Sequence, residues 1–427
     1  MILIKNKLIK SGANYSLASS FSAICSMIVG FLNMRWLGPE LLGIWQSITI
    51  VNSYLPIIQL GIQSGLNLEL PILLGERRND KAIEFVSTAF AFAIILSLFF
   101  TIVSAVAITV VISSGGDSKI IWGVVVVAVM AILSCFRLHY IATYRSANAF
   151  DKLTIIYWID SFVTLLLIIV IYRYQYFGLL IFHVVKDFLL TFLMFWFAPY
   201  RSVKPHFYRN HFKDLLKRGV FMTVYNEIKG IIDSLPRVML LRIGGVVQVG
   251  LFSPALVVGT FMNLIPVQIA QFLHPQLGMR YGQTKCARDM WPYFKALTFY
   301  IPLCLIPVAI GGWFVIPYIL EYVFPKYMDS ITPIRIMLIG FLFSTTFFSR
   351  GFMITLKAYK QVIILQVVDF LFFAGIPIIL IHYSHCGLLN SLAIGLSISY
   401  FLTYIINIIV VYRTITLPQY NAIDGAQ

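Results

Sequence analysis

The sequence predicts an all-α polytopic membrane protein with about twelve transmembrane helices, arranged as two six-helix bundles related by a pseudo-two-fold axis. Its 427 residues are 59% hydrophobic and only 11% charged, whereas soluble domains carry about 25% charged residues. Apolar runs of membrane length recur along the whole chain. In addition, the second half repeats features of the first at one constant offset. These three observations together argue against a soluble globular protein.

The apolar runs predict twelve spans, with approximate bounds 13–34, 42–68, 83–112, 119–137, 154–172, 178–198, 219–241, 246–273, 294–317, 331–350, 361–381 and 388–411. The second span is long enough for its end to leave the membrane or to tilt strongly. The longest loop is a basic cytoplasmic connector at 199–218, with a short surface helix expected at 212–218. It separates an N-terminal bundle at 1–198 from a C-terminal bundle at 219–427, which ends in a short cytoplasmic tail.

The charges of the loops predict the orientation. With the N-terminus inside, 22 of the 32 Lys and Arg residues fall on cytoplasmic segments and six on the opposite side. Such an excess marks the cytoplasmic side of a membrane protein, so both termini are expected in the cytoplasm. Because the positive charges lie between apolar segments, the net charge of +15 does not indicate nucleic-acid binding. No cleavable signal is expected, since Ile2–Lys10 leads straight into the first helix.

An internal repeat appears when the sequence is shifted by 207 residues without gaps. The shift aligns Leu8, Lys10, Gly12, Arg35, Gly38, Gly43 and Gly75 with Leu215, Lys217, Gly219, Arg242, Gly245, Gly250 and Gly282. An interval of 207 residues holds six spans, so both halves have the same orientation in the membrane. Two such bundles are related by an axis along the membrane normal, and the binding site is expected between them.

The central stretch Phe212–Arg242 is an apolar helix with one polar face. It carries three ionisable residues within the predicted span, namely Glu227, Lys229 and Asp233. A charge at the bilayer centre costs about 2.5–3.5 kcal/mol on insertion scales, far more than the roughly 0.3–0.6 kcal/mol that one large apolar residue contributes. The helix is therefore expected to line a polar cavity. The alternative is an internal ion pair between Lys229 and Asp233, which lie four residues apart.

The first helix of the chain has a matching face of small and polar residues. Tyr15, Ser19, Ser22, Ala23, Ser26, Gly30 and Asn33 lie on one side of it. Such a face indicates either a cavity lining or tight helix packing.

Further ionisable residues at membrane depth are candidates for function: Glu69, Asp160, Lys186, Asp187, Arg335, Arg350 and Asp369. Asp160 lies near enough to the cytoplasmic face for contact with solvent to be an alternative. Lys186 and Asp187 point about 100° apart on a helix and therefore need separate partners. Arg35, Arg237, Arg242 and Arg335 are expected near the outer mouth, where snorkelling to lipid headgroups is the alternative.

The five cysteines are scattered and imply no disulfide framework. His382 and His385 lie beside Cys386, but no further ligands are nearby, so neither a metal nor a cofactor is predicted.

The chain resembles the O-antigen and polysaccharide flippases of the multidrug/oligosaccharidyl-lipid/polysaccharide exporter superfamily. The resemblance rests on the opening LIKSGANYSLASSFSAI, the hairpin RWLGPELLGIWQ, the following QLGIQSGLNLELPILLGERR, and a basic connector before a second six-helix half. It covers essentially the whole chain, and its glycine-rich hairpin is moderately specific to the superfamily. The resemblance implies a multi-pass protein of the bacterial inner membrane with alternating access through a V-shaped central cavity. The implied cargo is a polyprenyl-diphosphate-linked oligosaccharide for O-antigen or lipopolysaccharide biosynthesis.

Carried over to this sequence, the resemblance and the charges at depth give two sets of site residues. The substrate-binding candidates are Asn33, Arg35, Glu69, Lys186, Lys229, Arg237, Arg242 and Arg335; the ion-coupling candidates are Glu227, Asp233, Asp369 and Asp160. Positive and negative charges at depth are nearly balanced, which differs from the cationic cavity that a diphosphate favours. The balance suits antiport coupled to H+ or Na+. Membrane lipids and a polysaccharide polymerase are the other partners implied.

Three other readings remain open. One is a cation-coupled multidrug exporter of the same superfamily, in which the acidic residues bind organic cations directly. Another, from a different class, is an integral-membrane polysaccharide polymerase or glycosyltransferase. The short outer loops argue against it, so a non-enzyme is predicted. The last is a purely structural membrane subunit, which leaves the polar central helix unexplained.

Overall fold

The computed structural model describes residues 2–147, 149–284, 286–344, 352–354, 356 and 358–417. In these ranges the regular secondary structure is helical, and the chain divides into two compact units. The first unit comprises Met1–Leu37 and Ile44–Ile231, and the second comprises Gly38–Gly43 and Ile232–Gln427. An all-helical polytopic membrane protein, as predicted, is confirmed.

Helices of membrane length account for most of the described chain. Seven of them are long and apolar enough to cross a membrane, or eight when the bent pair Arg209–Leu251 and Ser253–Leu264 counts as one span. This count is lower than the twelve spans predicted from the apolar runs, in part because three helices continue through a kink, at Gly38, Gln175 and Gly245. The predicted spans fall on helical segments on either side of these kinks, and the end of the tenth, 331–350, lies outside the described residues.

The two glycine kinks lie exactly one repeat apart and have the same backbone shape. Gly38 has φ 74° and ψ 174°, and Gly245 has φ 74° and ψ −173°. Positive φ is readily available only to glycine, which explains why both halves carry glycine here. After the first kink the chain restarts its helix at Pro39, a residue suited to a first helical turn. The repeat predicted from sequence spacing is thus also a repeat of backbone conformation.

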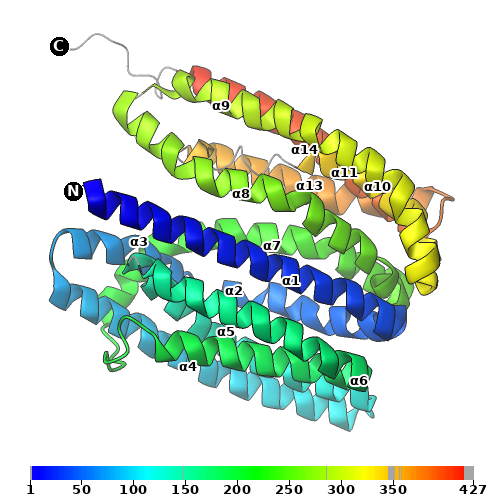
Figure 1. Ribbon diagram of the computed structural model, residues 1–427, viewed down its shortest axis with the longest axis horizontal. Helices are drawn as coiled ribbons and strands as arrows, with labels where there is room; N and C mark the ends of the chain where they lie inside the picture. The colour runs from blue at the N-terminus through cyan, green and yellow to red at the C-terminus, as the bar shows by residue number, and fades with distance from the viewer. Residues whose placement is uncertain are drawn as a thin grey trace. The chain divides into compact units, whose positions relative to one another are not determined.

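The first unit consists of α1 (Ile2–Thr49), η1 (Ile50–Ser53), α2 (Leu55–Ile58), α3 (Ile62–Gly75), α4 (Asn79–Ser113), α5 (Ser118–Ser146), α6 (Phe150–Trp196) and the beginning of α7 (Arg209–Leu251). α4, α5 and α6 lie alongside one another (Figure 1). The predicted second span is not one straight helix. It breaks between Ile50 and Gly61, where Leu60 and Gly61 both have positive φ.

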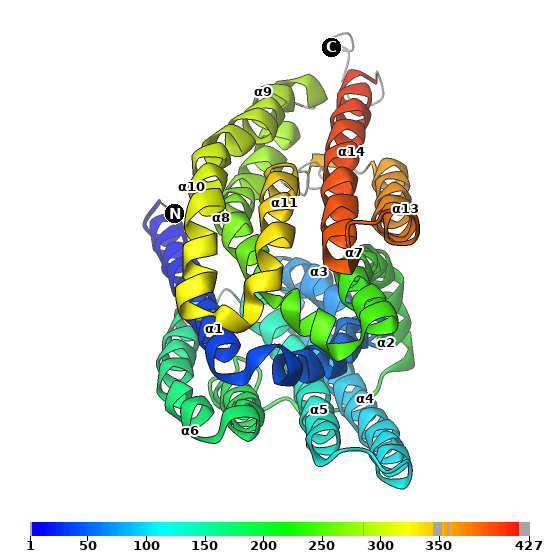
Figure 2. The ribbon, with the colours of Figure 1, turned by 90° about the vertical axis from the view of Figure 1, so that its right-hand side faces the viewer.

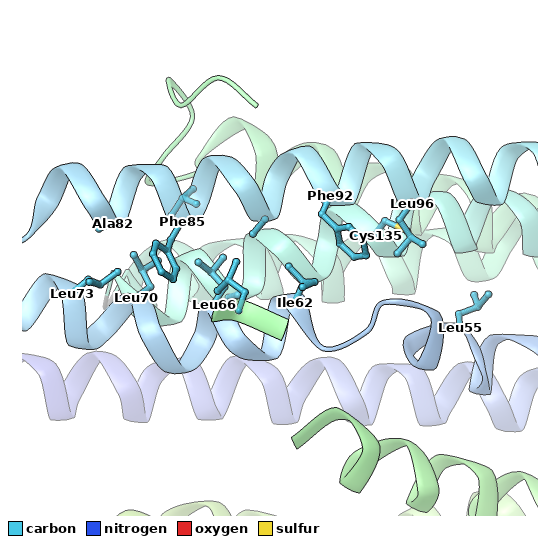
Figure 3. Close-up of a cluster of buried hydrophobic side chains, with 14 of the residues drawn as sticks. Leu55, Ile62, Leu66, Leu70, Leu73, Ala82, Phe85, Phe92, Leu96 and Cys135 are labelled. Atoms are coloured by element: carbon cyan, nitrogen blue, oxygen red, sulfur yellow. The ribbon is translucent and has the colours of Figure 1, made fainter. Parts of the chain in front are cut away.

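The apolar core of this unit lies where α3 packs against α4 and α5. Leu66, Leu70 and Leu73 of α3 point toward Phe85 of α4 (Figure 3). Farther along α4, Phe92 and Leu96 pack against Cys135 of α5, and Leu215 of α7 joins the same cluster. The outer faces are apolar too: Ile102, Val106 and Val110 of α4 are more than half exposed. Such a long apolar surface fits lipid contact.

The second unit contains the remainder of α7, α8 (Ser253–Thr284), η2 (Ala287–Met290), α9 (Trp291–Lys295), η3 (Ala296–Tyr300), α10 (Ile301–Val323), η4 (Pro325–Ser330), α11 (Ile331–Leu342), α13 (Tyr359–Tyr383) and α14 (Leu388–Thr416). α14 packs against α11 and α13 (Figure 2). A Cβ on Gly395 would lie 2.6 Å from Pro377 Cα, so a side chain there would block the close approach of α14 to α13.

The connector differs from its prediction. α7 begins at Arg209, so the expected surface helix at 212–218 is the first part of one continuous helix. The first compact unit also extends to Ile231 rather than ending before the connector. The physical reason is tight packing of α7 on α3, since a Cβ on Gly219 would lie 1.9 Å from Gly61 O. The division into halves at 1–198, 199–218 and 219–427 remains a proposal about the sequence repeat.

Candidate functional site

A buried polar network crosses from α1 to α6 in the first unit. Asp160 is 4% exposed, and its Oδ2 accepts a hydrogen bond of 2.8 Å from Ser22 Oγ. Lys186 Nζ lies 3.8 Å from the same oxygen and donates to Ser26 Oγ at 3.2 Å. An ion pair supported by hydroxyl groups is how a buried charge is made tolerable at membrane depth. Solvent contact, the alternative considered for Asp160, does not apply.

The kink at Gln175 makes this network possible. Asp160 precedes it and Lys186 follows it, on the two segments of α6. At Gln175 the backbone takes φ 48° and ψ −118°, which folds one segment back on the other; a Cβ on Gly178 would lie 2.3 Å from Val170 O. The two serines come from the small polar face of α1 that the sequence suggested. That face therefore serves the packing against α6 and supplies hydroxyl partners there.

A second buried ion pair lies next to the first along the chain. Arg137 Nη1 of α5 is 2.6 Å from Asp187 Oδ1 of α6. Lys186 and Asp187 thus have separate partners, which confirms the expectation from their 100° separation. Arg137 lies within α5, which continues to Ser146.

Glu69 and Arg218 pair where α3 meets the start of α7. The Glu69 side chain is 7% exposed, whereas the Arg218 side chain is 55% exposed. Arg218 had been assigned to a cytoplasmic loop and not to a site, although the need of a buried Glu69 for a cation was the signal for it. Asn33, another substrate-binding candidate, is buried in α1, and its Oδ1 accepts no hydrogen bond from any described residue.

The second unit buries polar groups where α13 and α14 pack together. Gln366 and Asp369 lie on α13, and Thr403 and Asn407 lie on α14, each at most 5% exposed. Ser399 Oγ of α14 donates to Phe372 O of α13 at 2.9 Å. Asp369 was the carboxylate hardest to explain structurally, and its place in this polar seam keeps it a functional candidate.

The other candidates on the second unit have varied surroundings. Arg335 Nε donates to Trp313 O at 3.2 Å, and its guanidinium carbon lies 5.4 Å from the Trp313 ring centroid. Asp233 of α7 is close enough to Tyr400 of α14 to act on it electrostatically. Arg237 is half-buried and Arg242 exposed. Arg335 is thus anchored within its own unit.

The remaining candidates belong to the first unit and are not gathered at one point. Glu227 and Lys229 are half-buried on α7, and Arg35 is exposed near the kink of α1. Of the twelve predicted site residues, the structure pairs Asp160 with Lys186 directly. Arg350 lies outside the described residues, as does the tail 418–427.

No group of three or more potential metal ligands occurs among the residues with described positions. The described residues instead hold three acid–base pairs with a buried carboxylate, namely Asp160 with Lys186, Asp187 with Arg137 and Glu69 with Arg218, and the first of these also has hydroxyl partners. Such pairs can exchange partners with a proton, a cation or an anionic cargo.

Comparison with known proteins shows the family. Residues 34–333 match the model of a family described as polysaccharide biosynthesis protein, and the chain belongs to that family. A search of curated protein sequences finds no significant match.

Solved structures show the same fold. An inward-facing multidrug resistance MATE family transporter of the MOP superfamily matches with a TM-score of 0.77 and 16% identity, over 92% of this chain and 94% of that chain. A MOP superfamily transporter from Pyrococcus furiosus, whose structure is described as having a binding pocket of reverse polarity, matches with a TM-score of 0.69 and 16% identity over 95% and 96%. The chain thus has the fold of MOP superfamily transporters and is a multi-pass membrane protein.

Proposed function

We propose that this protein is a secondary transporter that flips polyprenyl-diphosphate-linked oligosaccharide from the inner to the outer leaflet of a bacterial inner membrane. The observation that carries the proposal is the polysaccharide-family match over residues 34–333 on a chain with a transporter fold. A transporter that serves polysaccharide biosynthesis needs a cargo that is made inside and used outside. A lipid-linked sugar repeat unit fits that need, and the proposal gives the chain no enzymatic step.

The proposed orientation places both termini in the cytoplasm, as the 22-to-6 distribution of Lys and Arg favours. In that orientation the connector and the start of α7 lie at the inner surface. The kinks at Gly38 and Gly245, with Arg35 and Arg242 beside them, then lie at the outer surface.

The proposed roles follow from the charges at depth. Lys229 and Arg237 attract the diphosphate, aided by the outer arginines. A carboxylate that changes partner during the cycle couples transport to H+ or Na+, and Glu227, Asp233 and Asp369 are the candidates. Asp160 and Lys186 already neutralise each other at 3.8 Å, so we assign them to coupling as one unit.

A transport assay in liposomes tests the proposal. Purified protein is reconstituted with a polyprenyl-diphosphate-linked oligosaccharide in both leaflets, and an external glycosidase that cannot cross the membrane digests the accessible sugar. Flipping predicts digestion of nearly all of the substrate with the protein and of about half without it. Arg237→Gln should slow the digestion of the substrate that starts in the inner leaflet, because this part becomes accessible only after flipping. Digestion that stops at half in both preparations would rule out flipping of this substrate.

Export of organic cations is the second candidate function, because one of the solved structures that share this fold is a multidrug resistance transporter. Buried carboxylates such as Asp369 would then bind the cation directly. Efflux of a cationic dye from cells that express the protein separates the two functions: the flippase proposal predicts dye retention equal to that of cells without the protein.

A further inference from the structure

The first part of α7 is held against α3 by a set of contacts that we call the α3–α7 seam. Its members are Gly61, Ser64, Gly65 and Glu69 of α3 or the turn before it, and Leu215, Arg218, Gly219 and Thr223 of α7. All of them belong to the first compact unit, while α7 itself continues into the second unit at Ile232. The seam therefore fixes the end of the helix that links the two units.

Backbone contact makes the seam tight. A Cβ on Gly65 would lie 2.2 Å from Leu215 O, and a Cβ on Gly219 would lie 1.9 Å from Gly61 O. Thr223 Oγ1 donates to Ser64 Oγ at 2.9 Å. Close approach through small residues is a stable form of helix packing in membranes. Opening the seam therefore requires a new favourable interaction that replaces the contacts it loses.

The Glu69–Arg218 pair is the charged contact of the seam, and its two side chains differ strongly in their exposure. The carboxylate is buried, but more than half of the Arg218 side chain is exposed. A guanidinium has five N–H donors in a planar fork, and the contact with Glu69 uses the Nη1 nitrogen of a side chain that is more than half exposed. Arg218 can therefore reach a second anion without leaving its place on α7.

The surroundings of Arg218 favour an anion. Lys217 directly precedes Arg218 and Lys213 lies five residues before it, both exposed on α7, which begins at Arg209. Asp214, four residues before Arg218, is the acidic residue among these four basic ones, so the segment keeps a net positive charge. Phosphate groups bind Arg in a bidentate manner that is stronger than a neutral hydrogen bond, and a diphosphate carries more charge than a carboxylate.

We propose that Arg218 is the cytoplasmic receptor for the diphosphate of the cargo, and that the diphosphate displaces Glu69 from the guanidinium and so loosens the α3–α7 seam. This inference rests on the proposed flippase function and orientation. Once Arg218 turns to the diphosphate, Glu69 is a buried carboxylate without its cation, a state that is unfavourable unless the seam opens to water. Cargo binding and seam opening are therefore coupled, and each promotes the other.

A separate contact keeps the connector in place while the seam opens. His211 Nε2 lies 2.7 Å from Glu84 Oε2 of α4, and Ser87 Oγ donates to Lys204 O at 2.7 Å. These contacts lie on the connector side of Arg218. The part of α7 that follows them is thus the part that can move from α3.

Disulfide formation across the seam tests the inference. Ser64→Cys and Thr223→Cys are introduced together in the full chain with its five natural cysteines replaced, because the two hydroxyl oxygens are 2.9 Å apart. The protein is reconstituted in nanodiscs, and the rate of cross-linking by a mild oxidant is measured with and without a polyprenyl diphosphate. Binding of the radiolabelled diphosphate is measured in the same samples.

The inference predicts that the diphosphate slows cross-linking by about tenfold, which corresponds to a shift of about 1.4 kcal/mol in the opening equilibrium. Glu69→Gln should cross-link quickly with and without the diphosphate, because no buried carboxylate is left without its cation when Arg218 turns to the diphosphate. Arg218→Gln should bind the diphosphate weakly and lose the response, and Arg218→Lys should recover part of it. Lys81→Gln removes the same charge from an exposed position of α4, outside the seam and its basic surroundings, and serves as the matched control that keeps the response.

Three results would overturn the inference, and they differ in what else they imply. If the diphosphate binds but cross-linking is unchanged, or if Arg218→Gln responds like the wild type, the seam is not operated by the cargo and the flippase proposal stands. If no diphosphate binds to the wild type at all, both the inference and the proposed cargo fail.

Discussion

Arg137 and Asp187 form an ion pair in which the buried carboxylate needs a cation beside it. The two atoms in contact are 2.6 Å apart, and the Asp187 side chain is 11% exposed. Removing one member of such a pair leaves a buried charge without compensation, which is far more costly than removing both.

Arg137→Gln should therefore destabilise the protein by about 3 kcal/mol, at the low end for buried pairs because Arg137 is partly exposed. Thermal unfolding of the purified protein in detergent measures the effect as a lower Tm. The double variant Arg137→Gln and Asp187→Asn should regain most of the loss, since no unpaired charge remains. Equal losses in the single and double variants would show that the unpaired charge of Asp187 is not what destabilises the single variant.

At the scale of an element, the kinks and close approaches at glycines define where helices turn and cross. A Cβ on Gly43 would lie 1.9 Å from Val246 O, and a Cβ on Gly250 would lie 1.8 Å from Pro39 O. Gly43 and Gly250 are equivalent positions of the repeat, as are Pro39 and Val246. Both contacts lie within the second unit, because Gly38–Gly43 belongs to it.

Gly250→Ala should destabilise the protein by about 1–3 kcal/mol, the usual cost of overpacking. Gly375→Ala on α13 is the matched control, because its added Cβ meets nothing within 4 Å. The control should be neutral or stabilising by about 0.5–1 kcal/mol, as alanine favours a helix over glycine. The Tm of each variant is measured in the same detergent. An equal loss of stability in both variants would contradict the explanation by packing.

The sequence predicted the elements better than it predicted their partners. The offset that aligns Gly38 with Gly245 follows from spacing alone, and the structure gives both residues the same φ. The pairing of Asp160 with Lys186 depends on how α6 folds back at Gln175, and no glycine or proline stands at the kink itself to mark it in the sequence.

At the scale of the whole molecule, the account depends on charges that change partners during transport. Glu227 is half-buried on α7, the helix that runs from one unit into the other. A carboxylate in this position can be protonated or ionised as its surroundings change, which is what ion coupling requires.

Glu227→Gln should reduce export of surface polysaccharide by about tenfold or more while the protein stays in the membrane at its normal level. Polysaccharide on the cell surface and protein in isolated membranes are measured together. Lys81→Gln at an exposed position of α4 is the control and should leave export unchanged. Normal export by the Glu227→Gln variant would remove this residue from the coupling role.

The central claim is that the protein moves a lipid-linked oligosaccharide between leaflets, and the most direct measurement is the location of that lipid in cells from which the protein has been removed. The account predicts that the repeat unit accumulates on the cytoplasmic side and that surface polysaccharide is lost. A repeat unit that still reaches the outer leaflet but stays unpolymerised would contradict the account and place the protein after translocation.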